Sequence, residues 1–484
     1  MATSFTLEVP RGQIDDSLWI DNQRCRASGE TFVDVDDSAS EAVIASVRSA
    51  TRDDVDRAFA AARRAQPAWA RVPLEERIGI VRKATDILSA HGSVLADALV
   101  SEVGTLSSSV DKIQVGFGLN AISVTVDNAL AAFESQQLAS SQVVRQPAGV
   151  VAAITPWNYP IFQVALKLAP ALIAGCTMVL KPPGVAPLTA FAMAQSFALA
   201  GLPDGVFNVV CGAGGDIGNY LAGHPEADFV SFTGSVTAGR AVAMAAAGQG
   251  TRNAMELGGK SAALVLDEHL LDEAVRATFA NVISNTGQTC AALTRLVVPE
   301  QSLAQVEQLL AELVAGQVVG DPRAATSTIG PMSNRGQAET VMRYLRDAAS
   351  DPRVQLVAQA SMDGVHAGWF VPPTVFTARD HTSPIVQDEI FGPVLTVQPY
   401  TTRDEAIFLA NATRFGLIAR VWTDDADEFA RVAHELHVGG VIQSGRPTAP
   451  EAPFGGVKDS GYGRERGLYG IEEYLVPKSI QRLG

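Results

Sequence analysis

The sequence predicts an α/β protein built on two parallel sheets. From Val150 onward, short apolar segments alternate with helical segments, which is typical of parallel strands joined by crossover helices. Before that point, short alternating segments are followed by long helical ones. The 484 residues are enough for two or three domains with large cores.

The first 120 residues are expected to form small strands and then three helices. Residues 18–48 alternate apolar and polar side chains over short runs, as strands do. Thr51 is a suitable N-cap for a helix that ends near Ala70 and has Val55 and Phe59 on one face. Two further helices are predicted over 74–90, where His91-Gly92 is the stop signal, and over 93–103.

Residues 150–247 are expected to form the first parallel sheet and its helices. The pattern predicts strands over 150–155, 176–180, 206–210 and 228–232, and helices over 161–173, 188–200 and 235–247, the last capped by Ser235 or Thr237. Ligands of such sheets bind outside the carboxyl ends of the strands. Because Asn158, Lys181 and Ser235 lie at strand ends, they predict a cofactor site.

A second α/β unit is expected from Ser261 onward. Its predicted strands cover 262–266, 295–298, 374–376 and 392–397, and a helix is expected near 272–284. Cys290 lies in the loop after this helix, and Glu389 lies in a loop before a strand. We therefore expect this unit to carry the reactive cysteine.

Composition excludes several classes of function. A formal charge of −15 argues against nucleic acid or an anionic membrane as the main partner. The four widely spaced cysteines do not indicate a disulfide framework, and the N-terminus lacks the basic and apolar regions of a signal peptide. The apolar segment 164–180 is interrupted by Lys167, Pro170 and Gly175, so it does not predict a membrane span. We expect a cytoplasmic protein.

Two glycine patterns compete for a phosphate-binding role. Gly212-Ala-Gly-Gly-Asp-Ile-Gly218 departs from the usual dinucleotide spacing, so a plain turn is the favoured interpretation. Phe232-Thr-Gly-Ser-Val-Thr-Ala-Gly239 is the better candidate, because a helix that begins at Ser235 offers free amides and its dipole to a pyrophosphate. A possible metal pair, His434 and His437, lacks the spacing and the third ligand that a zinc site needs, so no metal is expected.

Cys290 and Glu256 are the candidate catalytic pair. In Asn285-Thr-Gly-Gln-Thr-Cys290, a nearby helix N-terminus or backbone amides would lower the pKa of the cysteine toward the thiolate. Glu256, in the apolar stretch Met255-Glu-Leu-Gly-Gly-Lys260, is expected to have a raised pKa and to take a proton near neutral pH. A thiolate that attacks a carbonyl and a base that activates water suit covalent catalysis.

The chain resembles the aldehyde dehydrogenase superfamily from about residue 150 to its end. The resemblance rests on the two stretches above and, in the same order as in the family, on Pro156-Trp-Asn-Tyr-Pro160, Phe232-Thr-Gly-Ser235, Glu389-Ile-Phe-Gly-Pro-Val394 and Pro453-Phe-Gly-Gly-Val-Lys-Asp-Ser-Gly461 with Gly463-Arg-Glu465. It implies two Rossmann-like domains and a small β arm for oligomerisation. The cofactor-binding domain would span 1–123 and 148–257, the catalytic domain 258–470, and the arm 124–147 and 471–484.

The resemblance implies an NAD(P)-dependent enzyme that oxidises an aldehyde to a carboxylic acid. Cys290 would form a thiohemiacetal and then a thioester, with its own N–H and the Asn158 side chain as oxyanion donors. Glu256 would activate the hydrolytic water, which favours this route over transfer to coenzyme A. Lys167 and Glu465 would relay the proton, with a structural salt bridge as the alternative. A catalytically idle relative is a second alternative.

Cofactor and substrate contacts also follow from the resemblance. It puts the cofactor against Thr155, Trp157, Lys181, Gly184, Gly234, Ser235, Leu257, Glu389 and Phe391. Many NAD-dependent members have glutamate where this chain has Gly184, so NADP is expected to be tolerated or preferred.

Tyr159, Leu166 and Phe454 would line an apolar entry tunnel, which favours apolar aliphatic or aromatic aldehydes. Gln443 departs from the asparagine usual in the family, and with Arg446 it leaves the shape of the tunnel loop open. A homodimer or homotetramer is expected.

Overall fold

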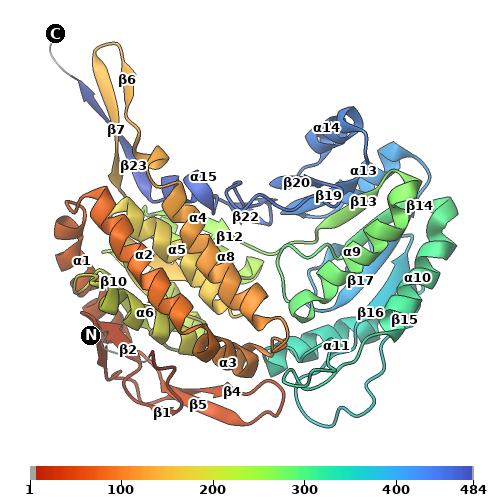
Figure 1. Cartoon of the computed structure of the whole chain (residues 1–484), viewed down its shortest axis with the longest axis horizontal. Coiled ribbons are helices and arrows are strands. Elements are labelled where there is room, and N and C mark those ends of the chain that lie inside the picture. The colour runs from red at the N-terminus through yellow and green to blue at the C-terminus, as the bar shows by residue number, and fades with distance from the viewer. Residues whose placement is uncertain (1–6, 482–484) are drawn as a thin grey trace.

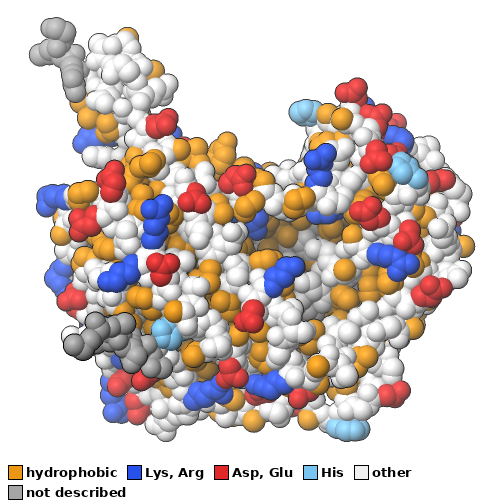
Figure 2. Space-filling view, viewed as in Figure 1, with side chains coloured by type: hydrophobic (Ala, Val, Ile, Leu, Met, Phe, Trp, Pro, Cys, Tyr) orange, Lys and Arg blue, Asp and Glu red, His pale blue; other side chains and the backbone are white. Residues whose placement is uncertain are grey.

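The computed structural model describes residues 7–481 and has two lobes and a projecting arm (Figure 1). The first lobe contains an eight-stranded sheet in the order β22-β12-β11-β8-β9-β10-β2-β3, and the second a seven-stranded sheet in the order β15-β16-β17-β14-β13-β19-β20. In the space-filling view a hollow lies between the lobes, and acidic and basic side chains are scattered over the visible surface (Figure 2).

Five central strands of the first sheet are parallel. They are β8 (Val150–Ile154), β9 (Thr177–Lys181), β10 (Phe207–Val210), β11 (Phe229–Thr233) and β12 (Arg252–Glu256). Antiparallel strands close both edges: β2 (Leu18–Ile20) with β3 (Gln23–Cys25) on one side and β22 (Gly461–Tyr462) on the other. The alternation of apolar strands and helices after residue 150 therefore correctly predicts a parallel sheet.

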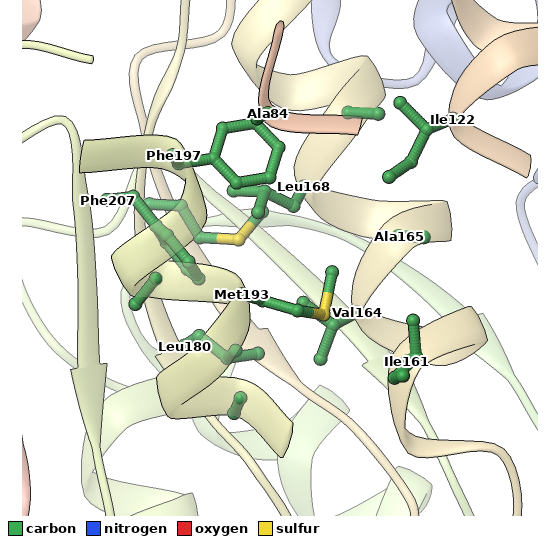
Figure 3. Close-up of a cluster of buried hydrophobic side chains, with 14 of the residues drawn as sticks. Ala84, Ile122, Ile161, Val164, Ala165, Leu168, Leu180, Met193, Phe197 and Phe207 are labelled. Carbon is green, nitrogen blue, oxygen red and sulfur yellow. The ribbon is translucent and has the colours of Figure 1, made fainter. Parts of the chain in front are cut away.

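Helices cover both faces of this sheet. On one face lie α1 (Arg52–Trp69), α7 (Gly214–Ala222) and α8 (Val236–Gly248); on the other lie α2 (Leu74–Ala90), α3 (Gly92–Val103), α4 (Phe117–Asp127), α5 (Pro160–Ala174) and α6 (Leu188–Ala200). Figure 3 shows the second face, where Met193 and Phe197 of α6 pack among Val164 and Leu168 of α5 and Phe207 of β10. Burial of these side chains fixes the strand ends that carry the site.

Thr51 caps α1 as predicted. Its side chain accepts a hydrogen bond from the Asp54 backbone, and the Asp54 carboxylate accepts one from the Thr51 backbone, which completes a capping box. A small three-stranded sheet precedes this helix and contains β1 (Gly12–Ile14), β4 (Phe32–Asp36) and β5 (Val43–Arg48).

The second lobe repeats the layered design. Its parallel strands are β13 (Ala262–Val265), β14 (Arg295–Pro299), β16 (Thr374–Ala378), β17 (Val394–Tyr400), β19 (Ile418–Trp422) and β20 (Gly440–Gln443), with β15 (Val354–Gln359) antiparallel at one edge. Packed around this sheet are α9 (Leu271–Ile283), α10 (Leu303–Ala315), α11 (Arg335–Ala349), α12 (Pro384–Gln387), α13 (Arg403–Asn411) and α14 (Ala426–Glu435). The second α/β unit predicted from Ser261 is thus present.

The arm is a hairpin of β6 (Gln136–Leu138) and β7 (Ser141–Pro147), and β23 (Leu475–Gln481) pairs with β7 along its whole length. It projects away from the first lobe (Figure 1). The first residues of the range expected for the arm, 124–127, belong instead to helix α4.

The C-terminal segment joins the two lobes. Strands β18 (Phe415–Gly416) and β21 (Val457–Lys458) pair with each other, β22 joins the first sheet although it falls within the range expected for the catalytic domain, and α15 (Gly467–Glu472) precedes the arm strand. Within residues 7–481, no helix has the length and apolar character needed to cross a membrane.

Candidate active site

A cavity of about 970 Å³ lies at the carboxyl ends of the first sheet and reaches Cys290. Its wall contains every residue that the sequence assigns to the cofactor: Thr155, Trp157, Lys181, Gly184, Gly234, Ser235, Leu257, Glu389 and Phe391. Asn158 and Cys290 lie on the same wall. The cavity falls within the size range of ligand sites, and its position is the one where such sheets bind nucleotides.

Both glycine patterns contribute to this cavity. Ser235 caps α8, and its Oγ accepts a hydrogen bond from the Ala238 N–H at 3.3 Å. The interpretation of Gly212–Gly218 as a plain turn is wrong, because this stretch opens helix α7, and Gly214, Gly215 and Gly218 line the cavity. Two helix N-termini therefore face one cavity, and the two patterns do not compete.

The carboxyl group of Glu389 occupies the space that a Cβ on Gly258 would take. A Cβ on Gly258 would lie 1.9 Å from Glu389 Oε2, and the Gly259 N–H donates to Glu389 Oε1 at 3.0 Å. Burial raises the pKa of Glu389 to about 7, although this hydrogen bond and the Lys260 charge oppose the shift. The two glycines of the Leu-Gly-Gly-Lys stretch thus hold a carboxyl group on the cavity wall.

The turn before Cys290 has an unusual backbone. Asn285 and Thr286 have φ values of 50° and 54°, a left-handed conformation that is uncommon for a β-branched residue. Hydrogen bonds from Thr105 Oγ1 to Asn285 Oδ1 and from Thr286 Oγ1 to the Gly330 carbonyl hold these two residues. The surrounding structure therefore enforces the bend that presents the cysteine.

Asn158 is fixed to the Cys290 loop. Its Nδ2 donates to the Gln288 carbonyl at 2.9 Å, and its own carbonyl accepts hydrogen bonds from Gln114 Nε2 and Asn285 Nδ2. One Nδ2 hydrogen remains available, and within residues 7–481 the N–H of Cys290 donates no hydrogen bond. Two donors are thus free beside the sulfur atom.

Gln114 is a supporting residue that the sequence analysis missed. It lies in the π-helical turn Asp111–Gly116, and its side chain also donates to Thr105 Oγ1 at 3.0 Å. Turns of this kind often occur at functional sites. A lone glutamine in a helical stretch carries no sequence signal for such a role.

The expected lowering of the Cys290 pKa does not occur. Cys290 is partly open to the cavity, yet the protein around it raises the pKa of the thiol to about 12. Burial is the main cause, Glu389 and Glu256 add to it, and Arg466 opposes it. The sulfur therefore needs a base before it can attack a carbonyl.

Glu256 is the candidate for this base, and it is the last residue of strand β12. Burial, and then the charge of Glu465, raise the pKa of Glu256 well above its usual value. Neither of its carboxyl oxygens has a hydrogen-bond partner among the described residues, and a Cβ on Gly455 would lie 2.7 Å from Oε1. The glycine of the Pro-Phe-Gly-Gly stretch thus leaves room for an ionisable group that can accept a proton.

Lys167 and Glu465 form a buried ion pair behind Glu256. Lys167 Nζ lies 2.9 Å from Glu465 Oε1 and 3.1 Å from Ser231 Oγ. A small cavity of about 10 Å³ touches Glu256, Lys167, Glu465 and Tyr474. This volume is that of about one water molecule, so the cavity has room for one water between the ion pair and the base.

The three residues expected on the substrate side lie outside the large cavity. The Tyr159 hydroxyl shares a hydrogen bond of 2.7 Å with Thr289 Oγ1, and Thr289 directly precedes Cys290 in the sequence. Phe454 pairs with Glu465 through two backbone hydrogen bonds, and Leu166 is buried in the core of the first lobe. Farther away, Gln443 donates to the Thr423 carbonyl, and the exposed Arg446 makes no side-chain hydrogen bond with a described residue.

A cysteine and a buried carboxyl group on the wall of a nucleotide-sized cavity are typical of a dinucleotide-dependent oxidoreductase. Residues 25–480 match the aldehyde dehydrogenase family. The chain belongs to this family, and it is an NAD(P)-dependent aldehyde dehydrogenase.

Relatives and solved structures agree over almost the whole length. A 3-succinoylsemialdehyde-pyridine dehydrogenase from a Pseudomonas species is 39% identical over 466 residues, 96% of this chain and 98% of the relative. Geranial dehydrogenase from Castellaniella defragrans is 37% identical over 92% of this chain and 94% of its own. A cysteine-to-alanine mutant of aldehyde dehydrogenase C from Pseudomonas syringae, in complex with NAD+ and octanal, superposes with a TM-score of 0.94 at 38% identity and 96% coverage of both chains.

Proposed function

We propose that Cys290 is the nucleophile and Glu256 the base of a hydrolytic aldehyde oxidation. The observation that carries this proposal is the meeting of Cys290 and Asn158 on one cavity wall, with the charge of Glu256 helping to raise the pKa of the thiol. Glu256 takes the thiol proton, and the sulfur adds to the aldehyde carbon. The oxygen of this thiohemiacetal becomes negative and is stabilised by Asn158 Nδ2 and the Cys290 N–H.

The cavity fits NAD(P)+, which supplies the acceptor for the hydride that leaves the aldehyde carbon. The adenosine side would contact Lys181 and Gly184, the pyrophosphate Gly234 and Ser235, and the nicotinamide side Glu389 and Phe391. Trp157, which packs edge-on against Phe391 at 5.4 Å, would stiffen the wall between them. Thr155 and Leu257 complete the contacts.

Loss of the hydride leaves a thioester on Cys290, which water then cleaves. Before this step, Glu256 passes the proton that it took from the thiol through a bridging water to the Lys167–Glu465 pair and is ionised again. Glu256 then removes a proton from the attacking water, the new C–O bond forms, and the C–S bond breaks to release the carboxylic acid. The thiolate of Cys290 takes the proton back from Glu256. This route accounts for a buried ion pair beside a base.

We propose that apolar aliphatic or aromatic aldehydes are the substrates. Tyr159 places an aromatic ring beside the Cys290 loop, and the similar proteins include a geranial dehydrogenase and an enzyme with bound octanal. The test is cofactor reduction with hexanal, benzaldehyde and succinate semialdehyde. Turnover of the first two without coenzyme A is expected, whereas activity only with coenzyme A would refute the hydrolytic route.

We propose that the enzyme tolerates or prefers NADP. Among the cavity-lining residues Glu389 is the one acidic side chain, and no carboxylate stands beside Lys181 to repel a 2′-phosphate. Lys181 Nζ has one hydrogen bond within the described residues, to the Pro182 carbonyl at 3.3 Å, which leaves N–H groups for a phosphate. The ratio of kcat/KM for NADP and NAD measures this preference directly.

We propose a cofactor-binding domain over 1–123 and 148–257, a catalytic domain over 258–470, and an oligomerisation arm over 124–147 and 471–484, although β22 lies in the first sheet and 124–127 continue helix α4. Leu138, Val476 and Ile480 are large apolar side chains exposed on the arm, which supports a homodimer or homotetramer. Val476→Asp with Ile480→Asp should lower the mass measured by light scattering, and an unchanged mass would refute the role of the arm. Four free cysteines fit a cytoplasmic location.

A further inference from the structure

Arg466 occupies an unusual place beside the active site. It follows Glu465, whose backbone is paired with Phe454 at 2.9 and 2.7 Å, and its own φ is 74°. The guanidinium carbon lies 4.5 Å from the centre of the Phe454 ring and 5.7 Å from that of Phe162. Two aromatic rings from different elements therefore hold the cation in place.

The guanidinium of Arg466 has no hydrogen-bond or ion-pair partner among the described residues. Within residues 7–481, no ion pair or hydrogen bond involves the Arg466 side chain, and its Nε is buried without an acceptor. The nearest acid in the chain, Glu465, is bonded to Lys167. An arginine keeps its charge in proteins. Arg466 is half-buried, and its buried Nε–H without an acceptor is costly. An oxygen-bearing ligand would satisfy it.

Arg466 lies along an aromatic path toward Cys290. Phe117 is 44% exposed at the outer end, and its ring packs near the rings of Phe162 and Tyr159 at 6.1 and 6.3 Å. The Tyr159 hydroxyl then bonds Thr289, next to Cys290. Arg466 contacts Phe162 on this path, and its charge opposes the rise of the Cys290 pKa.

We infer that Arg466 is a specificity-determining residue that donates hydrogen bonds to an oxygen on the substrate chain, beyond the aldehyde group. The preferred substrate is thus an aldehyde with an apolar or aromatic body that also carries a carboxylate or a ketone. The aromatic side chains contact the body, and the guanidinium binds the oxygen in its planar fork. This inference rests on the proposed aldehyde oxidation and narrows its substrate class.

The test compares Arg466→Met with the wild type on three aldehydes of similar length: hexanal, 6-oxohexanoate and 5-oxohexanal. Methionine keeps an unbranched apolar side chain against the rings and removes the donors. The wild type should favour at least one oxygen-bearing aldehyde over hexanal in kcat/KM. The substitution should reduce kcat/KM for that aldehyde on the order of 10- to 100-fold, with a much smaller effect on hexanal. A loss of kcat/KM for 6-oxohexanoate would identify a carboxylate as the recognised group, and a loss for 5-oxohexanal would identify a ketone.

Arg82→Met is the matched control, because this arginine is exposed on helix α2, outside the site, and makes no side-chain hydrogen bond with a described residue. It should leave all three values unchanged. A binding readout independent of turnover is competitive inhibition by hexanoate relative to hexan-1-ol, which Arg466→Met should abolish for a carboxylate site. Arg466→Lys is the second variant, to be used if Arg466→Met folds poorly. It keeps the positive charge and should retain part of the preference for the oxygen-bearing aldehyde.

Equal losses on all three aldehydes would overturn the inference and assign Arg466 to the cysteine or to the fold. A wild type with no preference for either oxygen-bearing aldehyde would also overturn it. Failure of the proposed function looks different, because the wild type would then oxidise none of the three.

Discussion

Replacement of Glu256 by glutamine separates the two halves of the reaction. The amide has nearly the same shape, and neither carboxyl oxygen has a hydrogen-bond partner among the described residues, so the fold should tolerate the change. Formation of the thioester requires ionised Cys290. Because burial raises the pKa of the thiol to about 12, only a small fraction of the cysteine is ionised near neutral pH. Glu256 contributes to this high pKa, so a neutral glutamine should lower the pKa of the Cys290 thiol. The larger thiolate fraction offsets part of the loss of the base in this first half of the reaction.

Hydrolysis has no such compensation. A positioned general base contributes typically about 10²- to 10⁴-fold, so the steady-state rate of Glu256→Gln should fall by that factor. Each active site should first release one equivalent of reduced cofactor and then stall as the thioester. In the wild type, the base must lose its proton, so kcat should rise with pH through the raised pKa of Glu256.

Stopped-flow absorbance of the reduced cofactor measures the burst, and intact-protein mass spectrometry detects the acyl group on Cys290. Hydroxylamine, which cleaves thioesters without a protein base, should restore part of the turnover. Steady-state turnover of Glu256→Gln at the wild-type rate would refute the assignment of the base. A burst in a Glu256→Gln protein that also carries Cys290→Ala would refute the assignment of the nucleophile.

Three further substitutions test other parts of the site and the fold. Cys290→Ala should abolish dehydrogenation while cofactor binding, followed by fluorescence titration, persists. Gly184→Glu should lower kcat/KM for NADP relative to NAD on the order of 10- to 100-fold, with a small shift of Val33, which a Cβ would approach at 3.3 Å; an unchanged ratio would contradict the proposed role of this position. Burial raises the pKa of Glu102 to about 8, so the folded state keeps this proton while the unfolded chain loses it above about pH 4.5. The free energy of unfolding therefore falls as the pH rises from about 4.5 to about 8. Glu102→Gln cannot ionise and should melt roughly 2–4 °C or more above the wild type at about pH 9, with little difference near pH 5, and equal shifts at both pH values would exclude this cause.

Local signals explain why much of the fold was predictable. The capping box at Thr51 and the glycine after α6, whose φ is 99°, mark helix ends through the chemistry of a few neighbouring residues. The strands β8 to β11 are buried on both faces and therefore read as continuous apolar runs. Such features depend on residues close together in sequence.

Features set by distant residues were not predictable in this way. β22 joins the first sheet because it pairs with β12, some 200 positions earlier. The Gly212–Gly218 stretch opens a helix, because α7 packs on the same sheet face as α1. Likewise, the pKa of Cys290 rises through burial by several segments, and Gln114 reaches Asn158 across 44 positions. Tertiary packing, which composition and periodicity do not encode, decides these properties.

Because Cys290 keeps its proton in the resting enzyme, its thiol should resist oxidation. Peroxide and electrophilic metabolites react with thiolates far faster than with thiols. A cysteine that is open to a cavity yet ionised in only a minute fraction of molecules should be oxidised slowly. The enzyme would then lose little activity to sulfinic acid formation between turnovers, although its own substrates are reactive carbonyl compounds. The burial that makes a base necessary thus also protects the cysteine from oxidation between turnovers.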